Sequence, residues 1–274
     1  MWEKVIQSKG EKPISFDLNS KTKNAPLIVF AHGFKGFKDW GTFNLLSETF
    51  AKQGFCFVKL NFSYNGTTPK DLNNFADLEA FGNNNYSREL NDLENLFDFL
   101  ESKNEFSEWY DFSKLALIGH SRGGGIALLK ASNDERVKKV ITLAALLDLG
   151  RTANPPNIEE WQQKGVLYIN NARTNQKMPM YWQFRENYIQ HFEDLSIELN
   201  AENIECPTLI IHGNNDEAVA VEQAFRTKDL IPQAQLEIIE ETGHTFDATH
   251  PWVENNLPSK SQEFVGLILN FLKS

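Results

Sequence analysis

The sequence predicts an α/β fold built on a doubly wound, mostly parallel sheet. Short apolar runs rich in β-branched residues recur along the 274 residues, and longer segments with apolar residues every three or four positions lie between them. Continuous apolar runs are typical of strands buried on both faces, and amphipathic segments are typical of the helices that cover such a sheet. Their alternation therefore indicates βαβ units.

The predicted elements follow one another regularly for most of the chain. Six runs are predicted as strands of the parallel sheet: residues 26–31, 55–62, 115–119, 137–143, 207–212 and 235–240. Apolar faces at helical spacing predict two clear helices, one with Tyr86, Leu90, Leu93, Phe97 and Leu100, and one with Phe264, Leu267, Ile268 and Phe271. Residues 13–18 alternate apolar with polar positions, which predicts an antiparallel edge strand ahead of the parallel set.

One long segment interrupts this alternation. Residues 147–203 show no clean succession of strand and helix, and they carry many aromatic side chains: Trp161, Tyr168, Tyr181, Trp182, Phe184 and Tyr188. A segment of this length in a regular α/β chain is usually an insertion with helices of its own. We therefore expect a single domain over residues 1–274, with a helical lid inserted at about 147–203.

The composition argues against several classes of protein. With 37 acidic and 27 basic side chains the net charge is −10 at pH 7, which disfavours binding to nucleic acids and to anionic membranes. The N-terminus lacks the apolar core of a signal peptide, and no run approaches the roughly 18 apolar residues of a membrane span. Two cysteines, Cys56 and Cys206, suit a reducing compartment. A cytoplasmic location is expected, with the oligomeric state open and a homodimer as one option.

The most informative segment is Gly119-His-Ser-Arg-Gly123. It has the pattern G-x-S-x-G and lies between a predicted strand and the helical run that begins at Ile126. At the apex of a tight strand-to-helix turn the backbone is strained, and the residues two positions away on either side must be small to let strand and helix approach. The pattern therefore predicts that Ser121 is a catalytic nucleophile.

A serine hydroxyl needs a general base, and that base needs an acid that orients it. In a doubly wound sheet both are expected later in the chain, in loops that follow strands. Asp216 follows the strand at 207–212, and His244 follows the strand at 235–240. We therefore predict a triad in which His244 acts as base and then acid towards Ser121, and Asp216 fixes the tautomer of the imidazole.

Other residues compete for these roles. Asp148 also follows a strand and is an alternative acid, while Glu217 adjoins Asp216. His244, Asp247 and His250 can be drawn as a metal site, but no fourth ligand lies nearby in the sequence. A loop is the preferred interpretation of these three residues, and no metal is expected.

A second glycine-containing loop, His32-Gly-Phe-Lys-Gly36, follows the first parallel strand. Acyl transfer requires preorganised donors aimed at the oxyanion that develops on the substrate. We predict that these donors are the backbone N–H groups of Phe34 and Arg122, because Gly33 lets the backbone come close and Arg122 directly follows the nucleophile. His32 is expected to hold the loop through hydrogen bonds.

Taken in order, His32-Gly-Phe34, the segment 119–124, Asp216 and Gly243-His244 resemble the motifs of the α/β-hydrolase superfamily over nearly the whole chain. Within it the sequence is most similar to compact esterases related to cinnamoyl (feruloyl) esterases and dienelactone hydrolases. The resemblance implies a carboxylic ester hydrolase without a cofactor, in which residues 147–203 form a lid over the pocket. Serine at position 121, where many dienelactone hydrolases carry cysteine, favours a serine esterase.

The predicted function is hydrolysis of small apolar or aromatic carboxylic esters through an acyl-enzyme on Ser121. Aromatic walls bury planar groups well, so Tyr181, Trp182 and Tyr188 of the insertion are predicted to bind the substrate. A serine peptidase of the prolyl or acylaminoacyl type, a thioesterase and a non-catalytic binding protein remain as alternatives.

The net charge also bears on the substrate. A value of −10 suits neutral or cationic esters better than polyanions. Lys35, Lys38 and Arg122 near the predicted mouth nevertheless offer three partners for a carboxylate.

Overall fold

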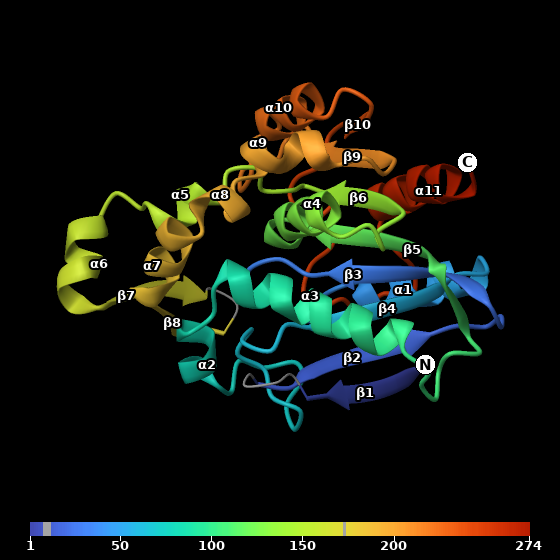
Figure 1. The fold of residues 1–274 in the computed structure, drawn as a ribbon, viewed down its shortest axis with the longest axis horizontal. Coiled ribbons are helices and arrows are strands. Elements are labelled where there is room, and N and C mark those ends of the chain that lie inside the picture. Colours follow the sequence, from blue (N-terminus) through green and yellow to red (C-terminus); the bar gives the residue numbers. More distant parts are fainter. Residues whose placement is uncertain (8–11, 172–173) are drawn as a thin grey trace.

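An eight-stranded sheet runs through the computed structural model, which describes residues 1–7, 12–171 and 174–274 (Figure 1). Its strands lie in the order β1-β2-β4-β3-β5-β6-β9-β10. Their bounds are β1 (Trp2–Ile6), β2 (Ile14–Asn19), β3 (Ala25–Ala31), β4 (Cys56–Asn61), β5 (Tyr110–His120), β6 (Lys139–Leu143), β9 (Thr208–Gly213) and β10 (Gln235–Ile239). β2 is antiparallel to β1 and β4, and the other neighbours are parallel. The doubly wound, mostly parallel sheet expected from the sequence is therefore confirmed.

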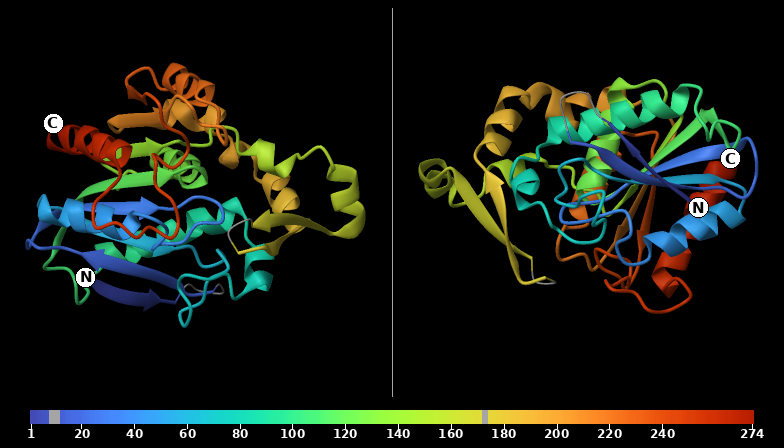
Figure 2. Two further views of the ribbon diagram at one scale, coloured as in Figure 1. Left: turned by 180° about the vertical axis from the view of Figure 1, so that it is seen from behind. Right: turned by 90° about the horizontal axis from the view of Figure 1, so that it is seen from below.

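Helices cover both faces of this sheet. Leu27, Val29 and Ala31 of β3 belong to one apolar cluster with α3 (Tyr86–Glu101) and α4 (Arg122–Asn133). Ile28 and Phe30 belong to a second cluster with α1 (Phe43–Lys52) and α11 (Ser259–Lys273). Figure 2 shows α1 and α11 on the face opposite to α3 and α4. Because side chains alternate across a strand, these continuous apolar runs are buried on both sides.

The remaining helices of the main body are short. α10 (Glu222–Leu230) packs on β9 and β10, and α2 (Leu78–Gly82) precedes α3. Within the described residues, no helix combines the length and the apolar character that crossing a membrane requires.

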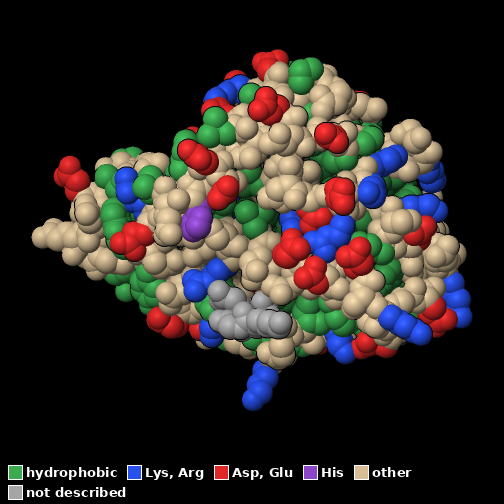
Figure 3. Space-filling view, in the orientation of Figure 1, with side chains coloured by type: hydrophobic (Ala, Val, Ile, Leu, Met, Phe, Trp, Pro, Cys, Tyr) green, Lys and Arg blue, Asp and Glu red, His purple; other side chains and the backbone are tan. Residues whose placement is uncertain are grey.

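Acidic and basic side chains lie close together on the face that carries α3 (Figure 3). Arg136, just after α4, pairs with Glu94 at 2.6 Å and Asp98 at 2.7 Å, both on α3, and with Asp134 at 2.7 Å. Part of the excess of acidic side chains is therefore neutralised locally.

The insertion lies between β6 and β9 along the chain and projects from one end of the sheet (Figure 1). It contains α5 (Gly150–Ala153), α6 (Ile158–Lys164), β7 (Val166–Asn171), β8 (Gln176–Tyr181), α7 (Gln183–Gln190), α8 (Phe192–Leu195), α9 (Ile197–Asn200) and the 3-10 helix η1 (Ala201–Asn203). The expected helices are present. The antiparallel pair β7-β8 was not expected, because polar residues and Pro179 obscure the strand pattern.

The prediction of an edge strand at residues 13–18 is wrong in one respect. This segment forms β2, but β1 occupies the edge, and β2 lies between β1 and β4 with both of its faces buried. Asp17, one of the polar positions of this segment, is 2% exposed, and its carboxylate is paired with Lys38 and Lys59. These partners are distant in the sequence, so alternation alone could not reveal them.

The same buried ion cluster fixes the loop that follows β3. Lys38 Nζ lies 2.8 Å from Asp17 Oδ2 and 2.7 Å from Asp39 Oδ2, and Lys59 pairs with both carboxylates. The backbone N–H of Lys38 also donates to Asn61 Oδ1 at 2.6 Å. The loop is thereby attached to β2 and β4, beside the end of β5.

Replacing Asp17 with Asn should destabilise the protein by about 3 kcal/mol or more, because the buried Lys38 and Lys59 would then share a single carboxylate, that of Asp39. Urea unfolding followed by circular dichroism measures this change. Glu48→Gln is the control, because Glu48 forms exposed pairs with Lys21 and Lys52, which typically contribute less than about 1 kcal/mol. Equal losses in the two variants would contradict a stabilising role for the cluster.

Candidate active site

Ser121 lies at the turn between β5 and α4. Its backbone has φ 57° and ψ −121°, a conformation that residues with a side chain rarely adopt. A Cβ atom added to Gly119 would lie 2.1 Å from the carbonyl oxygen of Gly123, and one added to Gly123 would lie 2.4 Å from that of Ala31. Neither position can hold a side chain, which is the steric requirement inferred from the sequence. The geometry is that of a nucleophile elbow.

His244 and Asp216 are brought together by the loops that follow β10 and β9. The Nδ1 atom of His244 lies 2.8 Å from Asp216 Oδ2. Asp216 Oδ1 accepts hydrogen bonds from the backbone N–H groups of Ala218 and Val219, at 2.9 and 2.8 Å. Because an ionised carboxylate only accepts hydrogen bonds, Nδ1 carries the hydrogen and Nε2 keeps its lone pair for proton transfer.

A second histidine, His212, contacts the same carboxylate. His212 is buried, and its Nε2 atom lies 2.8 Å from the carbonyl oxygen of Val219 and 3.2 Å from Asp216 Oδ2. Burial, the largest single influence, raises the pKa of Asp216, but the hydrogen bonds from His212, His244 and the Val219 backbone outweigh it. The pKa of Asp216 therefore lies below its usual range, and the group is a carboxylate at neutral pH.

His120 braces the loop that carries His244. Its Nε2 atom donates to the backbone oxygen of His244 at 2.9 Å, and the two rings are 4.9 Å apart. Burial, aided by the nearby His244, lowers the pKa of His120 to about 3, so the ring is neutral. His120 was not among the residues predicted for the site, although its place beside the nucleophile in the motif is a usable signal.

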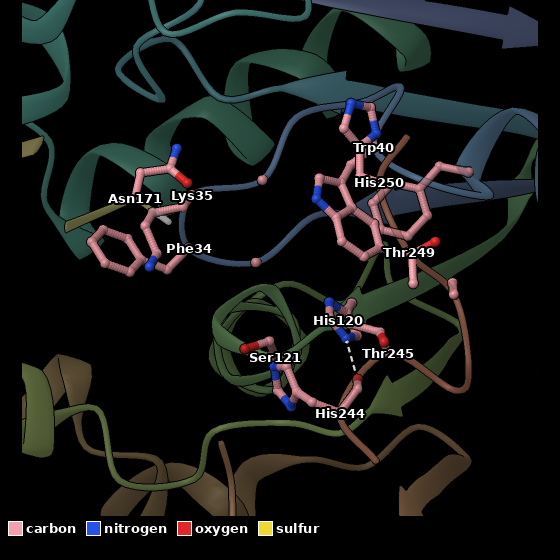
Figure 4. A pocket seen from close by; sticks show the side chains of 14 residues that line it. Phe34, Lys35, Trp40, His120, Ser121, Asn171, His244, Thr245, Thr249 and His250 are labelled. Atoms are coloured by element: carbon pink, nitrogen blue, oxygen red, sulfur yellow. Dashed lines mark hydrogen bonds between the residues drawn. The ribbon is translucent and has the colours of Figure 1, made fainter. Parts of the chain in front are cut away.

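Ser121 and His244 line one cavity of about 430 Å³. Figure 4 shows their side chains next to each other, with Phe34, Lys35 and Asn171 on one side and Trp40, Thr249 and His250 on the other. A molecule bound in this cavity can therefore contact both Ser121 and His244.

The two predicted oxyanion donors lie beside the serine. A Cβ atom on Gly33 would be 2.8 Å from Ser121 Cβ, so the loop carrying Phe34 passes directly over the elbow. Across the described part of the chain, no hydrogen bond uses the backbone N–H of Phe34 or of Arg122. Both groups are therefore available to a negatively charged oxygen.

The side chains of these two residues are in contact with each other. The Arg122 guanidinium lies 4.0 Å from the centre of the Phe34 ring and 3.4 Å from Glu89 Oε1, and it is 3% exposed. Cation–π attraction between these two side chains therefore links the turn at Ser121 to the loop that follows β3.

Hydrogen bonds of His32 fix the start of this loop, as expected. Its Nδ1 atom donates to the carbonyl oxygen of Gly33 at 2.9 Å, which leaves Nε2 to accept from Asn65 Nδ2 at 3.4 Å. Burial is the main reason that the pKa of His32 is lowered to about 4, so this ring is neutral as well.

The three aromatic residues predicted to bind substrate are not among the described residues that line the cavity at Ser121. The Tyr181 hydroxyl donates to Glu79 at 2.6 Å, and Trp182 packs edge-on against Trp161 with ring centres 5.4 Å apart. Tyr188 lines a separate cavity of about 220 Å³. Their role in substrate binding stays a prediction.

Half of the described residues that line the cavity were not predicted to bind substrate. They are Trp40, Phe43, Asn171, Thr245, Ala248, Thr249 and His250. Trp40 and Phe43 closely follow the loop at residues 32–36 in the sequence, and this proximity was the one signal that could have placed them at the site.

The competing assignments can be placed as well. Asp148 is exposed and accepts a hydrogen bond from the backbone of Arg151 rather than from His244. Glu217 is also exposed. Asp247 accepts from the Thr242 hydroxyl at 2.7 Å, and His250 Nδ1 accepts from the backbone N–H of Gly41 at 2.8 Å.

Two of the three cations expected at the mouth of the pocket are buried in ion pairs. Lys38 lies in the cluster with Asp17, and Arg122 lies against Glu89. Lys35 is the one of the three with its side chain at the cavity.

The strand order and the position of Ser121 between β5 and α4 are those of an α/β hydrolase. Residues 26–163 and 149–251 match the family described as alpha/beta hydrolase fold. The chain belongs to this family.

Individual proteins agree with that assignment. A protein of Mycoplasma pneumoniae, provisionally named esterase/lipase 1, is 25% identical over 89% of this chain and 90% of its own length. Est1E from Butyrivibrio proteoclasticus, solved with ferulic acid bound, superposes with a TM-score of 0.71 at 17% identity, covering 98% of this chain and 96% of that one. The α/β hydrolase GrgF from Penicillium sp. sh18 gives 0.76 at 14% identity, with 99% and 97% covered. These structures are similar in fold, and the family resemblance expected from the sequence is confirmed.

The stability of the protein should fall as the pH drops from about 6.5 towards 4. In the unfolded chain His32 and His120 protonate near 6.5, whereas in the folded protein their pKa values are about 4 and 3. Protons therefore bind the unfolded chain first, and each histidine removes about 1.4 kcal/mol of stability between pH 7.5 and 5.5. Urea unfolding across this range measures the loss.

The variant His120→Gln supplies the comparison, because an amide retains a donor but does not titrate. Its stability should depend less steeply on pH than that of the parent, by about 1 kcal/mol over the same range. Parallel curves for the two proteins would contradict a buried, neutral His120.

Proposed function

We propose that this protein is a serine esterase that hydrolyses carboxylic esters through an acyl-enzyme on Ser121. The observation that carries the proposal is the hydrogen bond between His244 Nδ1 and Asp216 Oδ2, because His244 lines the same cavity as Ser121. Membership of the α/β-hydrolase fold family and the esterase-like relatives support ester hydrolysis in general.

In the proposed first step, Ser121 Oγ attacks the ester carbonyl carbon and its proton passes to His244 Nε2. The carbonyl oxygen becomes an oxyanion that accepts hydrogen bonds from the N–H groups of Phe34 and Arg122. The carbon–oxygen bond to the alcohol then breaks, and the alcohol leaves with the proton from His244. Asp216 stays ionised and stabilises the imidazolium that forms between the two transfers.

In the second step a water molecule attacks the acyl-enzyme. His244 takes a proton from the water and returns it to Ser121 Oγ as the acid is released. Neither step changes an oxidation state, so no redox partner is needed. In this proposal His244 carries out each proton transfer.

The cavity wall supports an apolar or aromatic arm on the ester. Trp40 and Phe43 lie 5.7 Å apart at their ring centres, and Trp40 stacks on His250 at 6.0 Å with an interplanar angle of 25°. Flat apolar groups bury well against such rings. We propose that Trp40 and Phe43 take the place that the sequence analysis gave to the aromatic residues of the insertion.

Replacing Ser121 with Ala should reduce kcat/KM for 4-nitrophenyl acetate by at least about 10³-fold, because the nucleophile is lost while the fold is kept. Steady-state hydrolysis and labelling by a fluorophosphonate measure the effect, and labelling should disappear in His244→Ala. Ser132→Ala, at the far end of α4, is the control. Undiminished turnover by Ser121→Ala would refute the proposed function.

Replacing Trp40 with Ala should lower kcat/KM for an aromatic acyl ester relative to an acetyl ester by roughly tenfold, since the apolar wall is shortened. Trp182→Ala is the matched control, because Trp182 packs against Trp161 instead. The ratio of the two rate constants is measured for each variant. A larger change in Trp182→Ala than in Trp40→Ala would restore the insertion aromatics as the binding wall.

The same assays separate ester hydrolysis from the competing functions. A thioester and a peptide amide, each with the acyl group of the best ester, are compared with that ester in wild-type protein. Faster turnover of the amide would favour a peptidase, and faster turnover of the thioester would favour a thioesterase. No turnover and no labelling would favour a binding protein.

A further inference from the structure

We propose that Lys35 forms an anion subsite in this cavity, so that the preferred esters carry a carboxylate on one arm. The inference rests on the proposed esterase function and adds the class of substrate. Lys35 lines the same cavity as Ser121 and lies on the side away from Trp40 (Figure 4). An ester bound at the serine would thus meet an apolar wall at one end and an ammonium group at the other.

Lys35 differs from the neighbouring cations in having no carboxylate partner among the residues that the structure describes. Lys38 pairs with Asp17 and Asp39, and Arg122 pairs with Glu89. The Lys35 Nζ atom instead contacts the backbone oxygen of Asn170 at 3.4 Å and lies 5.9 Å from the Phe34 ring centre. No carboxylate of the described residues lies within 4.0 Å of it.

The described part of the cavity wall contains no acidic side chain. None of the described residues that line it is an aspartate or a glutamate, although the whole chain carries 37 of them. A bound carboxylate would therefore meet no like charge on the wall, in a protein whose net charge of −10 otherwise repels anions.

The ammonium group is also partly removed from water. The side chain is half-buried, and this desolvation lowers the pKa of Lys35. An anion placed beside the ammonium would replace the lost hydration, so binding would be stronger here than at an exposed lysine.

The backbone of Lys35 adds an independent observation. Its φ of 56° is in the left-handed region, where a residue with a side chain is strained and glycine is not. Such strain tends to persist at ligand-binding positions. The presence of a lysine at a position that favours glycine agrees with a role for its ammonium group.

The test compares pairs of esters that differ only in charge. For the acyl arm, 4-nitrophenyl hydrogen adipate is compared with its terminal primary amide. For the alcohol arm, 4-(carboxymethyl)phenyl butyrate is compared with its primary amide. In wild-type protein, kcat/KM for the carboxylate should exceed that for the amide by about tenfold in one of the two pairs, and that pair identifies the arm that reaches Lys35.

Variants then assign the preference to the ammonium group. The ratio should fall about tenfold in Lys35→Gln and in Lys35→Gly, and Lys35→Arg should retain it. Glycine adopts the positive φ without strain, so a loss in Lys35→Gly is not caused by misfolding. Lys177→Gln, an exposed lysine on β8 with the same change of charge, is the control and should keep the wild-type ratio.

The outcomes separate the two proposals. A ratio near one in wild-type protein for both pairs, or a ratio that is equally reduced by Lys177→Gln, would overturn the anion subsite while ester hydrolysis stands. Absence of any Ser121-dependent ester turnover would instead refute the proposed function itself.

Discussion

The site depends on one steric constraint, the contact between β3, β5 and α4 around the elbow. Added Cβ atoms at Gly119 and Gly123 would come within 2.1 and 2.4 Å of backbone oxygens, so the strands and the helix meet at distances that exclude side chains. This approach forces Ser121 into a positive φ and turns its hydroxyl out at the start of α4. It also brings the loop after β3 over the serine, so Ser121 and the predicted oxyanion donors are positioned by the same contact.

Two kinds of contact hold the residues around the elbow. Imidazoles contact His244 and Asp216, and buried ion pairs hold Lys38 and Arg122. His120 donates to the backbone of His244, and His212 lies 3.2 Å from Asp216, so an imidazole holds each member of the His244–Asp216 pair. Burial keeps His120 uncharged at neutral pH. The charges on Lys38 and Arg122 are matched by the carboxylates of Asp17 and Glu89. In the proposed mechanism, Asp216 is the charge that most directly stabilises an imidazolium on His244.

Much of the fold could be predicted because its signals are local. Continuous apolar runs identified every parallel strand, and the glycine spacing around Ser121 identified the elbow before any contact was known. What could not be predicted depends on partners far apart in the chain. The burial of Asp17 depends on Lys38 and Lys59, and Trp40 rather than Trp182 lines the cavity because Trp182 packs against Trp161 within the insertion.

The same distinction between local and distant partners explains why charge is a poor guide to the substrate until the fold is known. Three cations near the two motifs were equivalent in the sequence, yet two of them are neutralised by carboxylates from β2 and α3. Neutralising these two leaves the cavity wall with one ammonium and no carboxylate among its described residues. The net charge of −10 therefore does not describe the lining of the cavity, whose described residues include one lysine and no carboxylate. Recognition of an anionic arm would follow from this local difference, because short-range contacts outweigh screened long-range repulsion.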